Sequence, residues 1–230
     1  MTTTSSPSEP AAAVAAGAGD ALPDVIGGSP APKERLSGSL RRLLFTFIPA
    51  NLVLFAVYGA VPGVLLPTQI ADLDPAHKLA NLALVSTIGA LAALIAQPVA
   101  GQISDRTRSR FGRRAPWIVL GSLVAGLALI GMALANGLAQ IAIAWAIAQI
   151  MFNFAQGPLS AIVPDRVPKS ALGTFAAIGG GASMIGAVGG QALGAGFAAH
   201  FGTGYFLLGG ITFVVLTLFV GFNKRSSKRR

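Results

Sequence analysis

The chain has 230 residues, of which 53% are hydrophobic and 11% are charged. Soluble domains carry about 25% charged residues, so this composition excludes an ordinary soluble domain. A net charge of +9 would indicate nucleic-acid binding in a soluble protein, but here the basic residues follow the pattern of membrane loops, and we expect no nucleic-acid partner. The absence of cysteine excludes a disulfide framework and any thiolate metal site.

The first 40 residues differ in composition from the rest of the chain. They are rich in Thr, Ser, Pro, Ala and Gly and have few bulky apolar side chains. Such a segment cannot bury enough apolar surface to form a core. We therefore predict that residues 1–40 form a disordered cytoplasmic tail.

Six apolar segments follow, and none contains Asp, Glu, Lys or Arg. Each has about 20 residues or more, which is enough to cross a hydrocarbon core of about 30 Å as a helix. None alternates polar and apolar residues as a transmembrane β-strand does. We predict an all-α membrane protein with a six-helix bundle over residues 41–222 and a basic cytoplasmic tail over residues 223–230. The predicted helices are 43–66, 79–103, 116–135, 138–163, 171–199 and 203–222.

The charges in the loops predict the orientation of the bundle. Of the 17 Lys and Arg residues, only Lys78 falls on the side opposite to the others when six helices are counted. Positive loops stay in the cytoplasm, so both termini are predicted to be cytoplasmic. We expect a multi-pass protein of a bacterial plasma membrane.

The loop between the second and third helices, GQISDRTRSRFGRR, has a distinctive pattern. It resembles the signature loop of the major facilitator superfamily, which joins the same two helices. Five residues separate Asp-Arg from Gly-Arg-Arg, a longer form that is similar to the glycoside–pentoside–hexuronide:cation and sucrose-type sugar symporters. The stretch 153–168, NFAQGPLSAIVPDRVP, also resembles these relatives. The residues that carry the loop resemblance are Gly101, Asp105, Arg106, Gly112, Arg113 and Arg114.

The residue types in this loop have a physical rationale. Gly101 and Gly112 permit close backbone approach where two helices turn tightly. Asp105 can accept hydrogen bonds from guanidinium groups. Asp165, at the end of the fourth helix, is a predicted partner for Arg106 or Arg113. The resemblance implies that this set gates the cytoplasmic side; the alternative is a generic basic loop that only orients the protein.

Neutral polar residues remain as candidates for substrate binding, because the helices hold no carboxylate that could carry a proton. The resemblance implies that the first and fourth helices line a central cavity. Amides beside aromatic rings suit a sugar, although such amides can also join neighbouring helices by hydrogen bonds. The candidates are Asn51, Tyr58, Trp145, Gln149, Asn153 and Gln156.

No residue pattern indicates an enzyme, a metal site or a cofactor; His77 and His200 are far apart in the sequence. We expect half of a twelve-helix transporter fold, built from two three-helix repeats and acting as a sugar or glycoside symporter by alternating access. Its expected partners are the lipid bilayer, a small polar solute and a second six-helix bundle. That bundle would come from the rest of a longer chain, from a separate half or from a second copy. The alternative is a truncated or accessory membrane protein without transport activity.

Overall fold

The computed structural model describes residues 38–109 and 113–223. Within these ranges the chain is helical and has no strand, and six helices are long and apolar enough to cross a membrane. The prediction of an all-α, six-helix fold is therefore confirmed. The two predicted tails lie largely outside the described residues. Residues 110–112, which include Gly112, also lie outside them.

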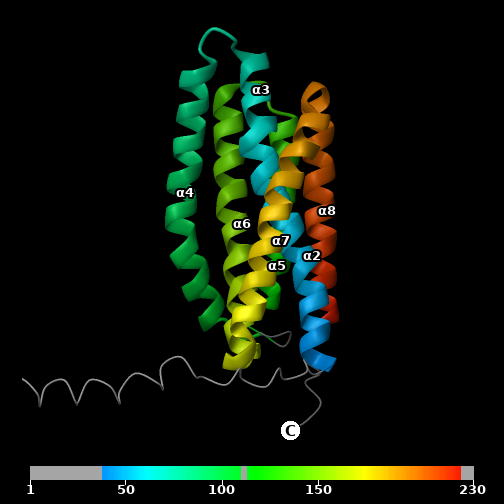
Figure 1. The fold of residues 1–230 in the computed structure, drawn as a ribbon. Helices are drawn as coiled ribbons and strands as arrows, with labels where there is room; N and C mark the ends of the chain where they lie inside the picture. Colours follow the sequence, from blue (N-terminus) through cyan, green and yellow to red (C-terminus); the bar gives the residue numbers. More distant parts are fainter. Residues whose placement is uncertain (1–37, 110–112, 224–230) are drawn as a thin grey trace, which may run out of the picture. The chain divides into compact units, whose positions relative to one another are not determined.

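The helices run alternately up and down (Figure 1). The first span is composite and consists of α2, a π-helical turn η1 and α3. Each of the other spans is one continuous α-helix, and a short 3₁₀ turn η2 precedes the last one. The elements are α2 (Gly38–Ala60), η1 (Val61–Leu65), α3 (Leu66–Leu73), α4 (Lys78–Arg106), α5 (Ala115–Ala133), α6 (Leu138–Arg166), α7 (Lys169–Gly196), η2 (Ala198–His200) and α8 (Phe201–Phe222).

The first span is longer than the segment predicted from hydropathy. It does not end at Leu66 but continues to Leu73. Pro62 and Pro67 would each interrupt an α-helix because proline lacks the backbone N–H group. The wider π turn between them keeps the chain helical past both prolines.

Glycine brings several helices into direct backbone contact. In α7, a Cβ atom added at Gly186 or Gly190 would overlap the carbonyl oxygen of Leu52 or Ala56 in α2. Between α5 and α8, Gly126 of α5 and Gly209 of α8 face each other, and a Cβ atom added to either would lie close to the carbonyl oxygen of the other. Small residues allow this close approach between membrane helices. The many glycines of the fifth span are therefore explained in part by packing of α7 against α2.

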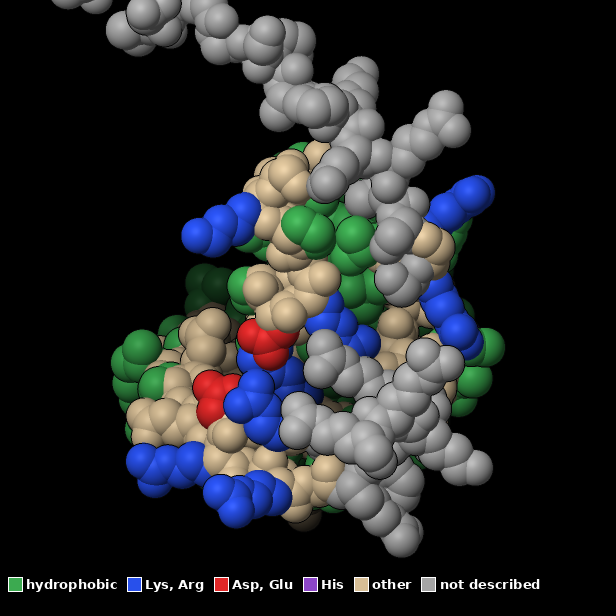
Figure 2. Space-filling model, turned by 90° about the horizontal axis from the view of Figure 1, so that it is seen from below, with side chains coloured by type: hydrophobic (Ala, Val, Ile, Leu, Met, Phe, Trp, Pro, Cys, Tyr) green, Lys and Arg blue, Asp and Glu red, His purple; other side chains and the backbone are tan. Residues whose placement is uncertain are grey.

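The bundle has two chemically different ends. At the lower end in Figure 1, where α4, α6 and α8 finish, the described side chains include many arginines; we call this the basic end. Seen from below, Lys and Arg side chains surround a few acidic ones (Figure 2). The described basic residues in the loops and helix ends here are Arg41, Arg42, Arg106, Arg108, Arg113, Arg114, Arg166 and Lys169. The other end, with the turns at 74–77, 134–137 and 197–200, is called the opposite end.

Candidate functional site

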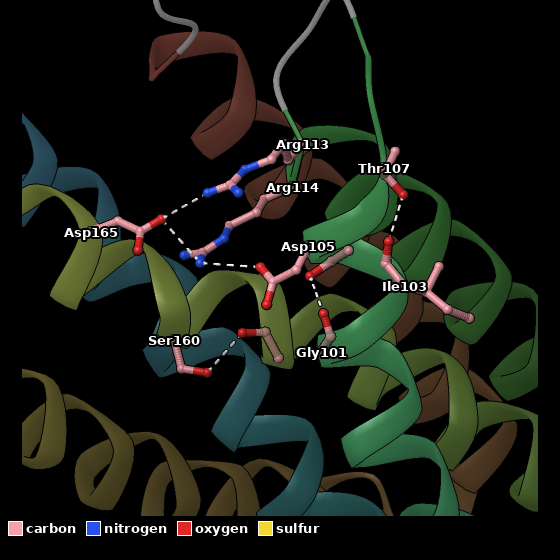
Figure 3. Close-up of polar contacts among 10 residues, drawn as sticks. Gly101, Ile103, Asp105, Thr107, Arg113, Arg114, Ser160 and Asp165 are labelled. Atoms are coloured by element: carbon pink, nitrogen blue, oxygen red, sulfur yellow. Dashed lines mark hydrogen bonds and ion pairs between the residues drawn. The ribbon is translucent and has the colours of Figure 1, made fainter.

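Ion pairs join the ends of three helices at the basic end (Figure 3). Asp105 lies in the last turn of α4, Arg114 immediately precedes α5, and Asp165 lies in the last turn of α6. The short α4–α5 connection brings its arginines back over the end of α6. Charged residues from two loops of the sequence thus converge on one cluster.

Arg114 is the centre of this cluster. Its Nη2 atom lies 3.0 Å from Oδ2 of Asp165 and 3.7 Å from Oδ1 of Asp105. Arg113 Nη2 lies 3.7 Å from the same Asp165 oxygen. Asp165 therefore contacts Arg113, one of its two predicted partners, while its shortest contact is to Arg114. Arg106 makes no ion pair with any residue that the structure describes.

Burial differs sharply among these side chains. The Arg114 side chain is only 13% exposed, whereas Asp165 is 44% exposed and Asp105 is 60% exposed. The Nε and Nη1 atoms of Arg114 are buried without a hydrogen-bond partner among the described residues. A cation in this position depends on its two carboxylates, because little water reaches it. The arrangement holds α4, α5 and α6 together through one guanidinium group.

The role predicted for Gly101 stays a prediction. A Cβ atom added at Gly101 would meet nothing within 4 Å in the part of the chain that the structure describes. From the α6 side, a Cβ atom added at Gly157 would lie 3.8 Å from Cβ of Ala100 and 4.0 Å from the backbone nitrogen of Gly101. Gly112, the other predicted position, lies outside the described residues.

A second contact fixes the start of the α4–α5 connection, and it was not predicted. Trp117 Nε1 donates a hydrogen bond of 2.7 Å to Oγ1 of Thr107, which itself donates to the carbonyl oxygen of Ile103. The Trp117 ring also lies 5.4 Å from the ring of Phe154 in α6. The Pro-Trp pair that follows Gly-Arg-Arg is the sequence feature that could have indicated this contact. Its spacing does not show that Trp117 bonds to Thr107.

A cavity of about 320 Å³ lies between α2, α6 and α7. It includes two of the predicted substrate residues, Asn51 and Gln156, one from each of the two helices expected to line a cavity. It extends to Val163, close to Asp165, and therefore lies in the half of the bundle nearer the basic end. The other lining residues that matter chemically are Phe47, Phe55, Ser160, Phe175 and Ser183.

The other predicted substrate residues do not line this cavity. Trp145 is 2% exposed and packs against Gly89 of α4, where a Cβ atom would overlap the indole nitrogen. Asn153 is buried and donates to the carbonyl oxygen of Gln149, whose own Oε1 atom is buried without a partner among the described residues. Tyr58 packs edge to face against Phe55 and Phe152. One face of α6 thus meets different neighbours along its length.

The polar groups of the cavity offer hydrogen-bond acceptors, together with N–H donors on Gln156 and Asn51. Ser160 and Ser183 each donate their hydroxyl hydrogen to a carbonyl of their own helix, and Asn51 donates to the carbonyl oxygen of Phe47. The hydroxyl lone pairs and the Asn51 Oδ1 atom stay available. None of the described lining residues carries a charge. Such a cavity favours a neutral solute with hydrogen-bond donors.

Six long apolar helices, neutral polar groups in a cavity between them and ion pairs at one end define a membrane bundle of the transporter type. The chain matches the sequence model described as Major Facilitator Superfamily over residues 39–230. Because this match covers most of the chain, the chain belongs to that superfamily. It is therefore an integral, multi-pass membrane protein of a transporter family.

Proposed function

We propose that this chain moves a sugar or glycoside across a membrane by alternating access, in symport with a cation. The observation that carries the proposal is the uncharged cavity that contains Asn51 and Gln156. Sugar hydroxyls donate to amide and hydroxyl oxygens, and the apolar faces of sugar rings stack on aromatic side chains. The phenylalanine walls and the amide and hydroxyl groups of the cavity fit both requirements.

Alternating access in this family requires two bundles that rock against each other. We propose that a second six-helix bundle completes the solute path, supplied by another part of a longer chain, by a separate subunit or by a second copy. The basic end is proposed to face the cytoplasm, with both termini on that side. The coupling site is proposed to lie on the second bundle, since no Asp, Glu, Lys or Arg lies in the apolar cores of the six spans described here.

We further propose that the cluster of Asp105, Arg113, Arg114 and Asp165 gates the basic end. The contacts of Arg114 with both carboxylates support this role, because they join three helix ends through carboxylates that water and salt reach. Arg106 and Gly101 belong to the proposed gate only through the family resemblance.

Uptake of radiolabelled hexose, pentose and disaccharide into vesicles containing the protein tests the proposal. We expect Asn51→Ala and Gln156→Ala to abolish uptake of the accepted sugar while membrane insertion stays normal. Gln140→Ala is the matched control, because this amide also lies on α6 but is remote from the cavity. That variant should transport like the wild type.

The outcomes separate the two functions that the sequence left open. Sugar-dependent uptake that disappears only in the cavity variants supports transport. Absence of uptake for every sugar, with or without a co-expressed second bundle, would instead favour an accessory membrane protein. If the Arg113→Ala and Asp105→Asn variants took up sugar like the wild type, the proposal that this cluster gates the basic end would be wrong.

A further inference from the structure

The π turn in the first span changes the backbone hydrogen bonds around Pro62. In an α-helix the N–H group of Leu66 would donate to the carbonyl oxygen of Pro62, four residues earlier. Here it donates to Val61, five residues earlier. The carbonyl group of Pro62 therefore loses its ordinary donor.

The next possible donor is also missing. In the π register, the carbonyl oxygen of Pro62 would accept from residue 67. Residue 67 is a proline, which has no N–H group. The hydroxyl group of Thr68, one turn on, donates to the carbonyl oxygen of Val64 instead. Two prolines five residues apart thus leave one main-chain acceptor free inside a membrane span.

Both Pro62 and Gly63 are exposed in the structure. An unpaired carbonyl facing lipid costs several kcal/mol, and irregular backbone at this depth is tolerated only beside protein or water. Pro62 also continues the helix face that begins with Asn51 and Phe55 in the cavity and passes through Tyr58. The free carbonyl therefore lies on the same side of the first span as the cavity, toward the opposite end.

An amide lies beside this turn. A Cβ atom added at Gly63 would be 3.3 Å from Cγ and 3.9 Å from Nε2 of Gln191 in α7. Gln191 is exposed, although its neighbours along the same face of α7, Met184 and Val188, are apolar. The missing side chain at Gly63 makes room for this amide against the widened turn. A free acceptor and an exposed amide thus meet at one place on two helices.

We propose that the Pro62 carbonyl and the Gln191 amide form a water-exposed hydrogen-bonding site for hydroxyl groups, between the cavity and the opposite end. Water occupies the site at rest, and a hydroxyl of the passing solute replaces it; the second step rests on the proposed function. The ligand must donate a hydrogen bond to the carbonyl oxygen. The site accepts neutral hydroxyl compounds because no described residue next to it carries a charge.

Cysteine labelling tests the water-exposed site without any knowledge of the solute. The chain has no cysteine of its own, so Gln191→Cys would give a single reactive thiol. Leu207→Cys is the control, since Leu207 is exposed on α8 and lies about as far from its helix end at the same end of the bundle. We expect a water-soluble, membrane-impermeant maleimide to react at least about tenfold faster with Gln191→Cys, because thiolates form in water and not in lipid. Equal rates would overturn the proposal.

A second pair of variants tests the carbonyl itself. Pro67→Ala restores an N–H group that can donate to Pro62 in the π register. Pro49→Ala restores an N–H group in the same span, away from the turn. If uptake of the accepted sugar falls about tenfold in Pro67→Ala only, with protein levels unchanged, the carbonyl contacts the solute. Equal uptake in both variants overturns the solute contact, whereas absence of uptake in the wild type would count against the proposed function and leave the labelling result to stand.

Discussion

The two ends of the bundle are joined by different kinds of interaction. At the basic end, Arg114 contacts two carboxylates that are substantially exposed. At the opposite end, Gln69 donates a hydrogen bond of 2.6 Å to the carbonyl oxygen of Met132 and accepts one of 3.0 Å from the hydroxyl group of Tyr205. Gln69 and Tyr205 are both buried and neutral. One end depends on charges near water and the other on buried amide and hydroxyl groups.

The difference indicates which end can separate more easily. Fully exposed ion pairs contribute about 0.2–1 kcal/mol and are screened by salt; here the carboxylates are exposed but the Arg114 side chain is only 13% exposed, so salt screens these pairs less. A buried polar group that loses its partner costs about 1–3 kcal/mol, and no solvent replaces the missing bond. The opposite end therefore acts as a fixed joint between α3, α5 and α8. At the basic end water reaches the two carboxylates, so solvent replaces part of the interaction when an ion pair separates.

The basic end has a second connection, made by hydrogen bonds of Asn223. Asn223, just after α8, donates 2.7 Å to Oγ1 of Thr46 in α2, and its carbonyl oxygen accepts from Arg166 at 3.3 Å. Arg166 follows Asp165 directly in α6. The end of α6 is thus connected to α5 by charges on one side and to α2 and α8 by hydrogen bonds on the other.

Breaking the joint at the opposite end should have the largest effect. Gln69→Leu keeps a similar volume but leaves the Tyr205 hydroxyl unpaired and removes one donor to the Met132 carbonyl, which keeps the N–H group of Ala135, so we expect a loss of about 1–2 kcal/mol in the free energy of unfolding. Tyr205→Phe removes one bond only and should cost less. Unfolding in mild detergent measures both. A Gln69→Leu variant as stable as Tyr205→Phe would show that the opposite end has no such joint.

At the basic end, Asp165→Asn should have a smaller effect that depends on salt. The substitution removes the charge that Arg114 and Arg113 share, and we expect a loss of about 1 kcal/mol in the free energy of unfolding, because Asp105 still lies beside the largely buried Arg114. At about 1 M salt the Debye length falls to about 3 Å, so the difference from the wild type should shrink. The loss caused by Gln69→Leu should not change with salt. If both variants respond alike, the contrast between the ends is wrong.

Much of the fold was predictable because it depends on composition and order. Charge-free apolar segments of sufficient length specify six spans whatever their packing. The first span was an exception, since prolines normally end a helix and nothing in the hydropathy predicts a π turn after Ala60. Only the backbone geometry shows that two prolines, at 62 and 67, can be accommodated in one continuous span.

The candidate site was only partly predictable, because side-chain roles depend on neighbouring helices. Trp145 and Gln156 lie on nearly the same face of α6, yet Trp145 packs on Gly89 and Gln156 lines the cavity. The periodicity of one helix cannot reveal which neighbour covers each turn. In the same way, the spacing of arginines in the α4–α5 loop could not show that Arg114, and not Arg106, lies nearest to Asp165.

The smallest effect on stability is expected from a substitution of Asp74, a charged residue of the opposite end. Its carboxylate accepts several hydrogen bonds from neighbouring residues. The backbone N–H group of His77 donates to its carboxylate at 3.1 Å, Asn81 donates at 3.0 Å, and these bonds lower the pKa of Asp74, the His77 bond most. Because the folded pKa lies below the unfolded value of about 3.9, the stabilisation is complete at neutral pH and is lost as the pH falls through the folded pKa. Asp74→Asn should therefore lower the melting temperature slightly at pH 7, and this difference should shrink as the pH falls below the unfolded pKa and through the folded one. A difference that persists in acid would mean that Asp74 acts through its shape and not its charge, and the opposite end would then be stabilised by neutral contacts alone.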